Sequence, residues 1–374
     1  MRNKPKLALV ATTAHTISSF MLGHIKKLSK HYIVFIYCNN AISLKKLVPK
    51  NVILTDINFK RKPNLIIDLY TFILLFFSFL KNRPQLTISL SPKAGFLTAL
   101  ASFISRISYR IHWFTGQVWV TREGFTQTFY IFLDKIIAKL SNHVLVDSYS
   151  QKRFLLSKKI ISRNKSSVLS NGSVGGVDIN RFKYKRMDRN LLRKKLKISK
   201  NNFVFLYLGR INKDKGVLDL IKAFKGIQET HSVFLVLVGP IENYYIKNYT
   251  NKNKKIIFIN KTLTPEKWFS MADILCLPSY REGFGSVVIE AASCNLPTLG
   301  SKIYGITDAI VKNQTGFFHK VGNINDIQKK MLFTIKNKRL LKNYGLKASK
   351  RVKKNFEEKM MSQKLLEFIN LRVN

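Results

Sequence analysis

The residues best suited to chemistry in this sequence are two carboxylates, Glu282 and Glu290, which stand eight positions apart. A glycine-rich turn follows the first, and an apolar run leads to the second. The run Ile274–Leu277 predicts a strand that Pro278 ends, and the residues from Ser286 onward predict a helix. Glu290 would lie about one turn inside that helix, so both carboxylates are expected near the carboxyl end of the strand.

The start of the same helix predicts an anion site. Gly285, Ser286 and Val287 would present free backbone amides at the positive end of the helix dipole, where phosphate groups bind. Two glutamates at this spacing also occur on ordinary solvated helices, but such helices need neither a Gly-Phe-Gly insert nor a preceding proline. A phosphate between two carboxylates that accept hydrogen bonds from hydroxyls describes a pocket for a nucleotide sugar.

A second candidate cluster follows the predicted strand Phe203–Leu208. Arg210 and Lys215 stand five positions apart, between this strand and the next predicted helix. The pair suits a diphosphate, because a guanidinium makes forked contacts and an ammonium supplies a point charge. In so basic a chain one such pair carries little information by itself, and Lys213 is interpreted as solvated.

These motifs together resemble the retaining family-4 glycosyltransferases of the GT-B fold, of the type that builds bacterial surface polysaccharides and lipid-linked glycans. Glu282 to Glu290 resembles the family's E-x7-E signature, and Gly209 to Gly216 resembles its G-R-x-x-x-x-K-G segment. Further resemblances lie in the junction motif within 171–182, in Val238-Gly239-Pro240, in Ala272-Asp273, and in 305–311, where Asp308 replaces the family's glutamate.

The resemblance implies a role for each residue of the cluster. Arg210 and Lys215 would bind the donor's diphosphate, Glu282 would contact the transferred sugar, and these three are the expected catalytic residues. Glu290 would bind the ribose hydroxyls, and the amides of Gly285, Ser286 and Val287 would bind the phosphate. The base would lie against residues 261–264, which include Thr264.

The first part of the chain resembles the family less closely. The family's glycine-glycine loop after the first strand is absent, and Thr13 lies in that region. Thr115 and Gly116 follow the predicted strand Tyr109–Phe114, and with Thr13 they are expected on the acceptor side. His112 is the histidine nearest the family's catalytic position; a histidine in such a strand is more often packed in the core, which leaves catalysis by His112 as the lesser alternative.

Composition bounds the partners. The 65 Lys and Arg residues against 20 Asp and Glu give a formal charge of +45. Such a field favours nucleic acid, an acidic lipid surface or phosphate-bearing substrates, although a biased genome composition would produce the same excess. The three cysteines, Cys38, Cys276 and Cys294, lack metal-type spacing and are expected as buried thiols in a reducing compartment. We expect no metal and no other cofactor.

Strands that alternate with helices predict an α/β fold with parallel sheets. The resemblance implies two Rossmann-like domains that face each other across a cleft. Residues 1–182 are expected to form the acceptor-side domain, 183–200 a linker, 201–355 the nucleotide-sugar domain, and 356–374 a helix that returns to the first domain. Residues 12–19 are expected as a polar loop that opens a helix.

One long apolar run, Leu69–Leu80, raises the question of a membrane. About 20 apolar residues are needed to span a bilayer, so a core helix or a membrane-surface helix is expected instead, with the core helix favoured. The basic start Met1–Lys6 is followed only by a strand-length apolar run, which does not resemble a signal peptide.

The function implied by the resemblance is metal-independent, retaining transfer of a hexose or N-acetylhexosamine from a nucleoside diphosphate sugar, with UDP expected. The acceptor would be a polyprenyl-diphosphate-linked saccharide in O-antigen, capsule or related glycan synthesis, used by a cytoplasmic enzyme bound peripherally to the anionic inner face of the plasma membrane. The alternatives are a soluble small-molecule acceptor, a catalytically silent scaffold and, remotely, a nucleic-acid-binding protein, which is disfavoured because the aromatic residues lie mostly in apolar runs.

Overall fold

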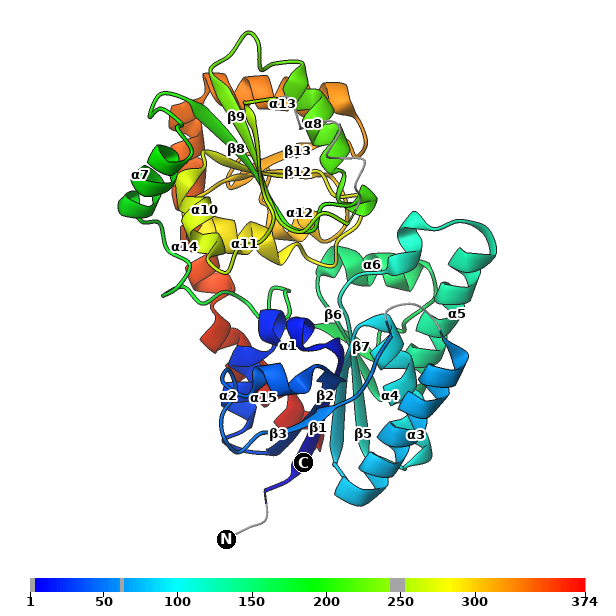
Figure 1. Cartoon of the computed structure of the whole chain (residues 1–374). Helices are drawn as coiled ribbons and strands as arrows, with labels where there is room; N and C mark the ends of the chain where they lie inside the picture. Colours follow the sequence, from blue (N-terminus) through cyan, green and yellow to red (C-terminus); the bar gives the residue numbers. More distant parts are fainter. Residues whose placement is uncertain (1–3, 61–63, 243–252, 374) are drawn as a thin grey trace. The chain divides into compact units, whose positions relative to one another are not determined.

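The structure, a computed structural model, describes residues 4–60, 64–242 and 253–373. The chain forms two compact units (Figure 1), the first from Met1–Gly176 with Glu358–Asn374 and the second from Val177–Glu357. Each unit is built around its own sheet, in which all recorded strand pairs are parallel. The predicted α/β fold with two parallel-sheet units is therefore confirmed.

The first unit contains a seven-stranded sheet in the order β3-β2-β1-β4-β5-β6-β7. Strand β1 (Lys6–Thr13) pairs with β2 on one side and β4 on the other and is buried on both faces, which explains its apolar sequence. The strands are β1 (Lys6–Thr13), β2 (Ile33–Asn39), β3 (Ile53–Asp56), β4 (Leu86–Leu90), β5 (Tyr109–Phe114), β6 (His143–Val146) and β7 (Ser166–Val168).

Helices cover both faces of this sheet. Alternate residues of β1 point to opposite sides, so Ala8 and Val10 join one core while Leu7 and Leu9 join the other. The helices on the Ala8 side and beyond β5 are α3 (Leu65–Asn82), α4 (Pro92–Ile104), α5 (Gly124–Leu140) and α6 (Tyr149–Ser157). On the Leu7 side lie α1 (Ala14–Phe20), α2 (Leu22–Leu28) and the last helix, α15 (Glu358–Val373), which packs against α2.

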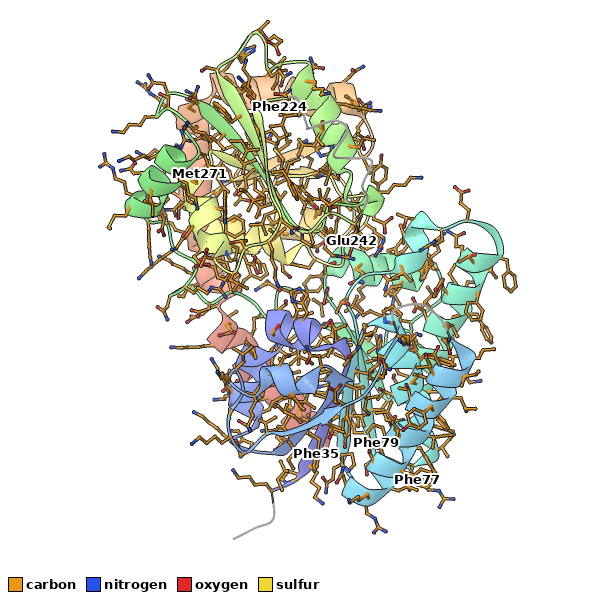
Figure 2. The ribbon with its side chains drawn as sticks, in the orientation of Figure 1. Phe35, Phe77, Phe79, Phe224, Glu242 and Met271 are labelled. Atoms are coloured by element: carbon orange, nitrogen blue, oxygen red, sulfur yellow. The ribbon has the colours of Figure 1, made fainter. Side chains whose placement is uncertain are left out.

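Helix α3 is not the core helix that its apolar sequence favoured. Only 17% of its residues are buried, namely Thr71, Leu75 and Phe79. Phe79 is buried and packs against Tyr37 of β2, whereas Phe77 is exposed; both phenylalanines are labelled in Figure 2. The prediction of a core helix was wrong because it rested on apolar content alone. An apolar stripe that faces the core and one that faces outward have the same composition.

The second unit contains a six-stranded sheet in the order β10-β9-β8-β11-β12-β13. Figure 2 labels Phe224 and Met271 in its core, and both are fully buried. The strands are β8 (Phe203–Leu208), β9 (Val233–Val238), β10 (Ile256–Ile259), β11 (Ile274–Leu277), β12 (Thr298–Ser301) and β13 (Gly316–His319). The helices are α7 (Arg186–Lys195), η3 (Lys213–Lys215), α8 (Val217–Lys225), α10 (Pro265–Met271), α11 (Ser286–Ser293), α12 (Ile306–Ala309), α13 (Ile324–Lys336) and α14 (Lys338–Asn355).

The boundaries differ from those expected. The first unit ends at Gly176 rather than at residue 182, because Val177 and Phe182 belong to the core of the second unit. Residues 183–200, expected as a linker, include α7, which packs on α10. The tail returns to the first unit from Glu358 onward.

Asp273 is the reason that so basic a segment is not a solvated linker. Arg189 Nη2 donates to its Oδ1 at 2.7 Å, and Arg193 Nη2 donates to its Oδ2 at 2.8 Å. The same Oδ2 accepts the backbone N–H of Val204 in β8 at 2.7 Å. Arg193 is only 3% exposed, so its charge is stable in the core chiefly because Asp273 compensates it.

The start of the chain also differs from expectation. Residues 12–19 do not form a loop, because β1 continues to Thr13 and α1 begins at the next residue. Thr13 caps this helix by accepting the N–H of Thr16 at 3.3 Å. The sequence reading also missed α6, β7, β12 and β13, of which the three strands are short and carry no long apolar run.

We predict that Asp273→Asn lowers the free energy of unfolding of the second unit by about 3 kcal/mol, because Arg193 would remain buried without a counter-charge. Urea-induced unfolding measures this change. The control is Glu367→Gln, which removes the exposed Lys364–Glu367 pair of α15 and should leave the unfolding midpoint unchanged. Equal midpoints for Asp273→Asn and the unmutated protein would contradict the role given to Asp273.

Candidate active site

The candidate site of the second unit lies at the carboxyl ends of β8, β9 and β11. β8 lies between β9 and β11, and the chain order of the strands reverses there. Such a reversal leaves a crevice outside the carboxyl ends of the strands, which is the common ligand position in open parallel sheets. Three loops meet at this edge, comprising residues 209–216, 239–242 and 278–285.

Glycines allow these loops to approach each other. Gly216 has a φ of +63°, and a side chain there would collide with the carbonyl of Pro278. A side chain on Gly239, whose φ is +146°, would collide with the carbonyl of Gly209. Both positions therefore require glycine for conformation and for space.

The structure brings Lys215 and Glu282 together. Asn212 caps the short helix η3 by accepting the N–H of Lys215 at 3.2 Å, which orients the lysine after β8. Lys215 Nζ then donates to Glu282 Oε1 at 2.5 Å, and Ser279 Oγ donates to the same oxygen at 2.9 Å. Two residues predicted from separate motifs thus occupy one site, with a cation and a carboxylate in direct contact.

Arg210 lies at the same edge and contacts Glu242, a residue that the sequence reading did not single out. Arg210 Nη1 lies 3.2 Å from Glu242 Oε2, which also accepts Asn212 Nδ2 at 2.8 Å. The backbone of the arginine is held by Tyr207, whose hydroxyl donates to the Arg210 carbonyl at 2.6 Å. Glu242 follows the Val238-Gly239-Pro240 turn, and that turn was the available signal for it.

A second set of contacts fastens the β8 loop to the β11 loop. Arg281 donates to Asp214 Oδ2 through Nε and Nη2, at 2.9 and 2.7 Å. The Tyr280 hydroxyl donates to Asp219 Oδ2 at 2.7 Å, and its backbone N–H donates to the Asp214 carbonyl at 2.8 Å. Lys213 is exposed, as expected.

Helix α11 begins as predicted, at Ser286. Gly285 precedes it in a left-handed conformation, with a φ of +80°. Phe284 is buried and packs against Phe356, with 5.3 Å between ring centroids, so the loop that presents the amides of Gly285, Ser286 and Val287 is anchored in the core. This geometry suits an anion at the helix start.

Glu290 follows one turn into α11. Burial raises the pKa of its carboxyl to about 7, while Arg181 lowers this pKa and Glu266 raises it. Arg181 Nε itself donates to Glu266 Oε2 at 3.2 Å. Hydrogen-bond donors on a ligand would favour the charged form of this carboxyl and lower its pKa.

Thr264 stands at the start of α10, where its backbone N–H donates to Thr262 Oγ1 at 3.1 Å. The Trp268 indole also donates to that oxygen, at 3.0 Å. The segment 261–264 is thereby fixed beside the following helix. Its neighbour Leu263 projects outward and is highly exposed.

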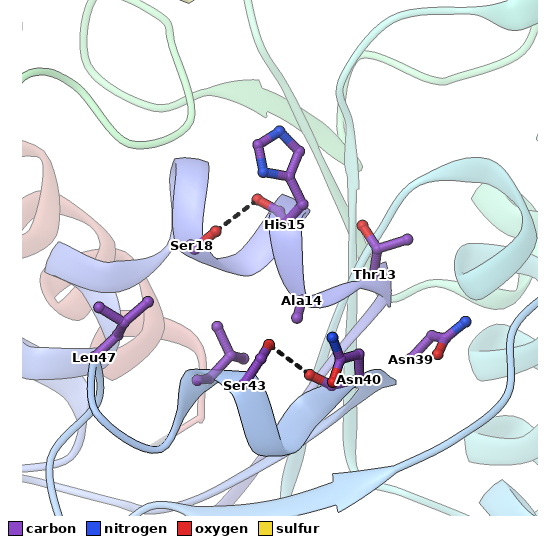
Figure 3. Close-up of a pocket in the computed structure, with 9 residues that line it drawn as sticks. Thr13, Ala14, His15, Ser18, Asn39, Asn40, Ser43 and Leu47 are labelled. Carbon is purple, nitrogen blue, oxygen red and sulfur yellow. Dashed lines mark hydrogen bonds between the residues drawn. The ribbon is translucent and has the colours of Figure 1, made fainter. Parts of the chain in front are cut away.

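In the first unit, Thr13 lines a cavity of about 390 Å³ at the carboxyl ends of β1 and β2 (Figure 3). Its lining is rich in hydroxyl, amide and imidazole groups: Thr13, Ala14, His15, Ser18, Asn39, Asn40, Ser43, Leu44 and Leu47. Ser18 Oγ donates to the His15 carbonyl at 3.1 Å, and Ser43 Oγ donates to the Asn40 carbonyl at 2.7 Å. Hydroxyl and amide groups of this kind suit hydroxyl-rich ligands.

The other predicted acceptor residues do not line this cavity. Thr115 and Gly116 follow β5 and are partly exposed, and Gly116 has a φ of +114°. His112 is a core residue, so the structure does not support the catalytic role considered for it. Its ring is 1% exposed, its Nδ1 lies 2.9 Å from Ser89 Oγ, and burial lowers its pKa to about 3.

In the part of the chain that the structure describes, metal-ligating side chains are not clustered. Within the described ranges, no three His, Cys, Asp or Glu residues are grouped as a metal site would require. The three cysteines are buried as free thiols.

Comparison with known proteins shows which proteins the chain resembles. The family described as glycosyl transferases group 1 matches residues 188–351. The capsular polysaccharide biosynthesis glycosyltransferase CapM of Staphylococcus aureus is 29% identical over 99% of this chain and 98% of its own length. A UDP-Gal:alpha-D-GlcNAc-diphosphoundecaprenol alpha-1,3-galactosyltransferase of Escherichia coli is 26% identical over 71% of this chain and 70% of its own length.

Solved structures share the fold. The crystal structure of Anabaena HepE in complex with UDP and glucose has a TM-score of 0.81 at 17% identity, over 97% of this chain and 99% of that one. WaaG, a glycosyltransferase involved in lipopolysaccharide biosynthesis, has a TM-score of 0.76 at 14% identity, over 97% and 99%. The chain is therefore a glycosyltransferase of the GT-B fold, and its second unit carries the glycosyltransferase group 1 domain.

Proposed function

We propose that this enzyme transfers a hexose or N-acetylhexosamine, with retention of configuration and without a metal, from a nucleoside diphosphate sugar to a lipid-linked saccharide. The observation that carries the proposal is the contact of Lys215 with Glu282 at the carboxyl ends of β8 and β11. A cation for a phosphate and a carboxylate for sugar hydroxyls are thereby adjacent, as a sugar diphosphate requires. We expect UDP as the nucleotide.

Each donor group has a counterpart in the second unit. Arg210 and Lys215 bind the diphosphate, and the amides at the start of α11 bind the phosphate next to the sugar. Glu282 accepts hydrogen bonds from the sugar hydroxyls, and Glu290 accepts them from the ribose. The base lies against the segment that contains Thr264.

The resemblance to retaining GT-B glycosyltransferases implies the chemistry. The bond between the anomeric carbon and the donor phosphate breaks, while the acceptor oxygen bonds to the same face of that carbon. An oxygen of the leaving phosphate takes the proton of the acceptor hydroxyl. Arg210, Lys215 and the α11 dipole stabilise the negative charge that develops on the leaving diphosphate, from loops whose backbones are already held.

The acceptor is inferred from the relatives. CapM is named for capsular polysaccharide, and the Escherichia coli relative is named for an acceptor on diphosphoundecaprenol. We infer a polyprenyl-diphosphate-linked saccharide in capsule, O-antigen or related synthesis, with its sugar in the polar cavity that contains Thr13. Such an acceptor implies a cytoplasmic enzyme bound peripherally to the inner face of the plasma membrane.

A second candidate is a soluble acceptor. An N-acetyl-alpha-D-glucosaminyl L-malate synthase of Bacillus anthracis is 28% identical over 48% of this chain. That match covers about half of either protein, whereas the match to CapM covers nearly all of both, so the lipid-linked acceptor is favoured. Transfer to free malate or to a free monosaccharide would instead support the soluble candidate.

We predict that Glu282→Ala lowers the rate of sugar transfer by about 100-fold or more, because hydrogen bonds to the sugar that strengthen in the transition state are lost. Affinity for UDP, which lacks the sugar, should be retained. Radiolabelled sugar transfer and calorimetric UDP binding measure the two effects. Glu229→Ala, an exposed glutamate after α8, is the control and should behave as the unmutated enzyme. Undiminished turnover of Glu282→Ala would remove Glu282 from the site.

Arg210→Ala should weaken UDP binding by about 2–4 kcal/mol, because a charged contact to the diphosphate is lost. Lys213→Ala is the matched control in the same loop, and its exposed side chain should leave affinity unchanged. Since side chains rather than a metal bind the diphosphate, UDP affinity and activity of the unmutated enzyme should both persist in EDTA. Loss of activity in EDTA with recovery on adding manganese would contradict the metal-free mechanism.

Donor binding should depend on pH through Glu290. Because the free carboxyl has a pKa of about 7 and the ribose hydroxyls favour its ionised form, affinity should rise with pH across neutrality. Calorimetry with UDP-glucose between about pH 6 and about pH 8 measures this, since a sugar-substituted diphosphate does not titrate in that range. Glu290→Gln should bind more weakly with a flat profile. An unchanged slope in Glu290→Gln would assign the dependence to another group.

A further inference from the structure

The first unit carries an apolar surface that its own core does not use. On α3, exposed apolar side chains recur at intervals of four and three residues: Leu65, Leu69, Ile73, Phe77 and Leu80. This spacing places them on one side of the helix. Leu65 is 91% exposed, and Phe77 is 62% exposed. Contiguous exposure of large apolar groups on this scale is unusual for a protein surface that faces only water.

Two polar residues of α3 lie toward the protein instead. Asp68 accepts Lys93 Nζ of α4 at 2.8 Å. Thr71 is buried, and its hydroxyl donates to the Asn58 carbonyl at 3.2 Å. These two groups are hydrogen-bonded within the protein, while large apolar side chains lie on the outer side of the helix.

Helix α5 repeats this arrangement. Phe125, Phe129 and Phe132 are exposed at intervals of four and three residues, and Phe125 is 85% exposed. The acid of the same helix, Asp134, is buried and accepts the Trp119 indole N–H at 2.8 Å. Two helices of one unit therefore present large apolar side chains outward. We call the exposed apolar residues of α3 and α5 the outer apolar face.

Helices α3, α4 and α5 lie side by side in the first unit (Figure 1), with α4 in contact with both of the others. Exposed cations follow the apolar residues near the carboxyl ends of the three helices, at Lys81, Arg83, Arg106 and Lys139. From residue 57 to residue 110 the sequence contains a single acid, Asp68, which is already paired. Hydrocarbon with adjacent unpaired positive charge complements a bilayer that carries negative headgroups.

The connections of α3 decide how it can meet a bilayer. Among the described residues, α3 is the one helix long and apolar enough to cross a membrane. It joins β3 to β4, however, and both strands are hydrogen-bonded within the same sheet. At 18 residues it is also about 27 Å long, slightly shorter than the hydrocarbon core. A helix tied at both ends to one sheet can lie in the interface but cannot span it.

We propose that the outer apolar face docks this enzyme on an anionic phospholipid bilayer, with α3 and α5 lying in the plane of the interface. The occupant is the lipid surface itself, because the exposed charges near the carboxyl ends of the three helices, at Lys81, Arg83, Arg106 and Lys139, are positive. The proposal rests on the proposed function only in that a lipid-linked acceptor would be reached at the same surface.

Flotation with vesicles tests the docking. The full-length protein should float with phosphatidylcholine vesicles that contain phosphatidylglycerol, and less with phosphatidylcholine alone. The variant Leu69→Gln/Ile73→Gln/Phe77→Gln, changed only at exposed positions, should partition at least about tenfold more weakly. The matched control changes three exposed apolar residues of the second unit, Met187→Gln/Leu191→Gln/Leu263→Gln, and should float as the unmutated protein does.

Two results would overturn the proposal. One is equal flotation of the α3 variant and the unmutated protein, or no flotation of either at low salt. The other is a dimer in sedimentation velocity that the α3 variant abolishes, which would assign the face to a second copy of the chain. Retained UDP binding in the α3 variant shows that its second unit is intact. Normal flotation with no sugar transfer would instead refute the proposed function and leave the docking standing.

A fluorescent label tests which face meets the lipid. The three native cysteines are buried, and burial raises the pKa of each thiol, so they should not react with a polar thiol reagent. A nitrobenzoxadiazole label on Phe77→Cys should shift to the blue when anionic vesicles are added. The same label on Leu263→Cys should not shift. A shift at residue 263 without one at residue 77 would overturn the assignment of the face.

Discussion

The carboxyl ends of β8, β9 and β11 approach so closely that their loops leave no room for side chains at the points of contact. A Cβ on Gly239 would collide with the Gly209 carbonyl, and one on Gly216 would collide with the Pro278 carbonyl. A Cβ on Gly305 would lie 2.5 Å from the Gly283 carbonyl oxygen. This close packing sets the positions of the charged residues that the loops carry. Lys215 and Glu282 meet because the backbones of their loops are held in place. A bound diphosphate would replace Glu282 as the partner of a lysine that is already positioned, so binding would not have to order a mobile side chain.

The fold was largely predictable because parallel strands that are buried on both faces read as apolar runs. β5, β8 and β11 were anticipated at their observed bounds. Two errors share a cause, namely that sequence does not state the direction in which a side chain points. The basic run at α7 was interpreted as a linker, although Arg189 and Arg193 point inward to Asp273. The apolar run at α3 was expected in the core, although most of it faces outward.

The candidate site was predictable where charged residues and the glycines that shape their loop lie in one short segment. The E-x7-E run and the Arg210–Lys215 segment each combine glycines with charged residues, and the structure brings Lys215 and Glu282 into contact. Glu242 was missed because a lone glutamate after a turn has no distinguishing spacing. His112 was considered because of its type, but its burial beneath Gly95 is a property of packing that no local pattern encodes. Polar cavities such as the one at Asn39 and Asn40 arise from loops distant in sequence and share this difficulty.

The return of the last helix has a consequence for biosynthesis. Met361, Leu365 and Ile369 of α15 belong to the same core as Leu7, Leu9 and Ile25, and the whole second unit lies between these two stretches of chain. As the polypeptide leaves the ribosome, all residues of the second unit are synthesised before α15. At that stage the first unit still lacks the helix that completes one side of its hydrophobic core. The first unit, although its synthesis begins first, is thus the last to complete its core. Until α15 packs, the apolar groove that this helix will fill is accessible to chaperones.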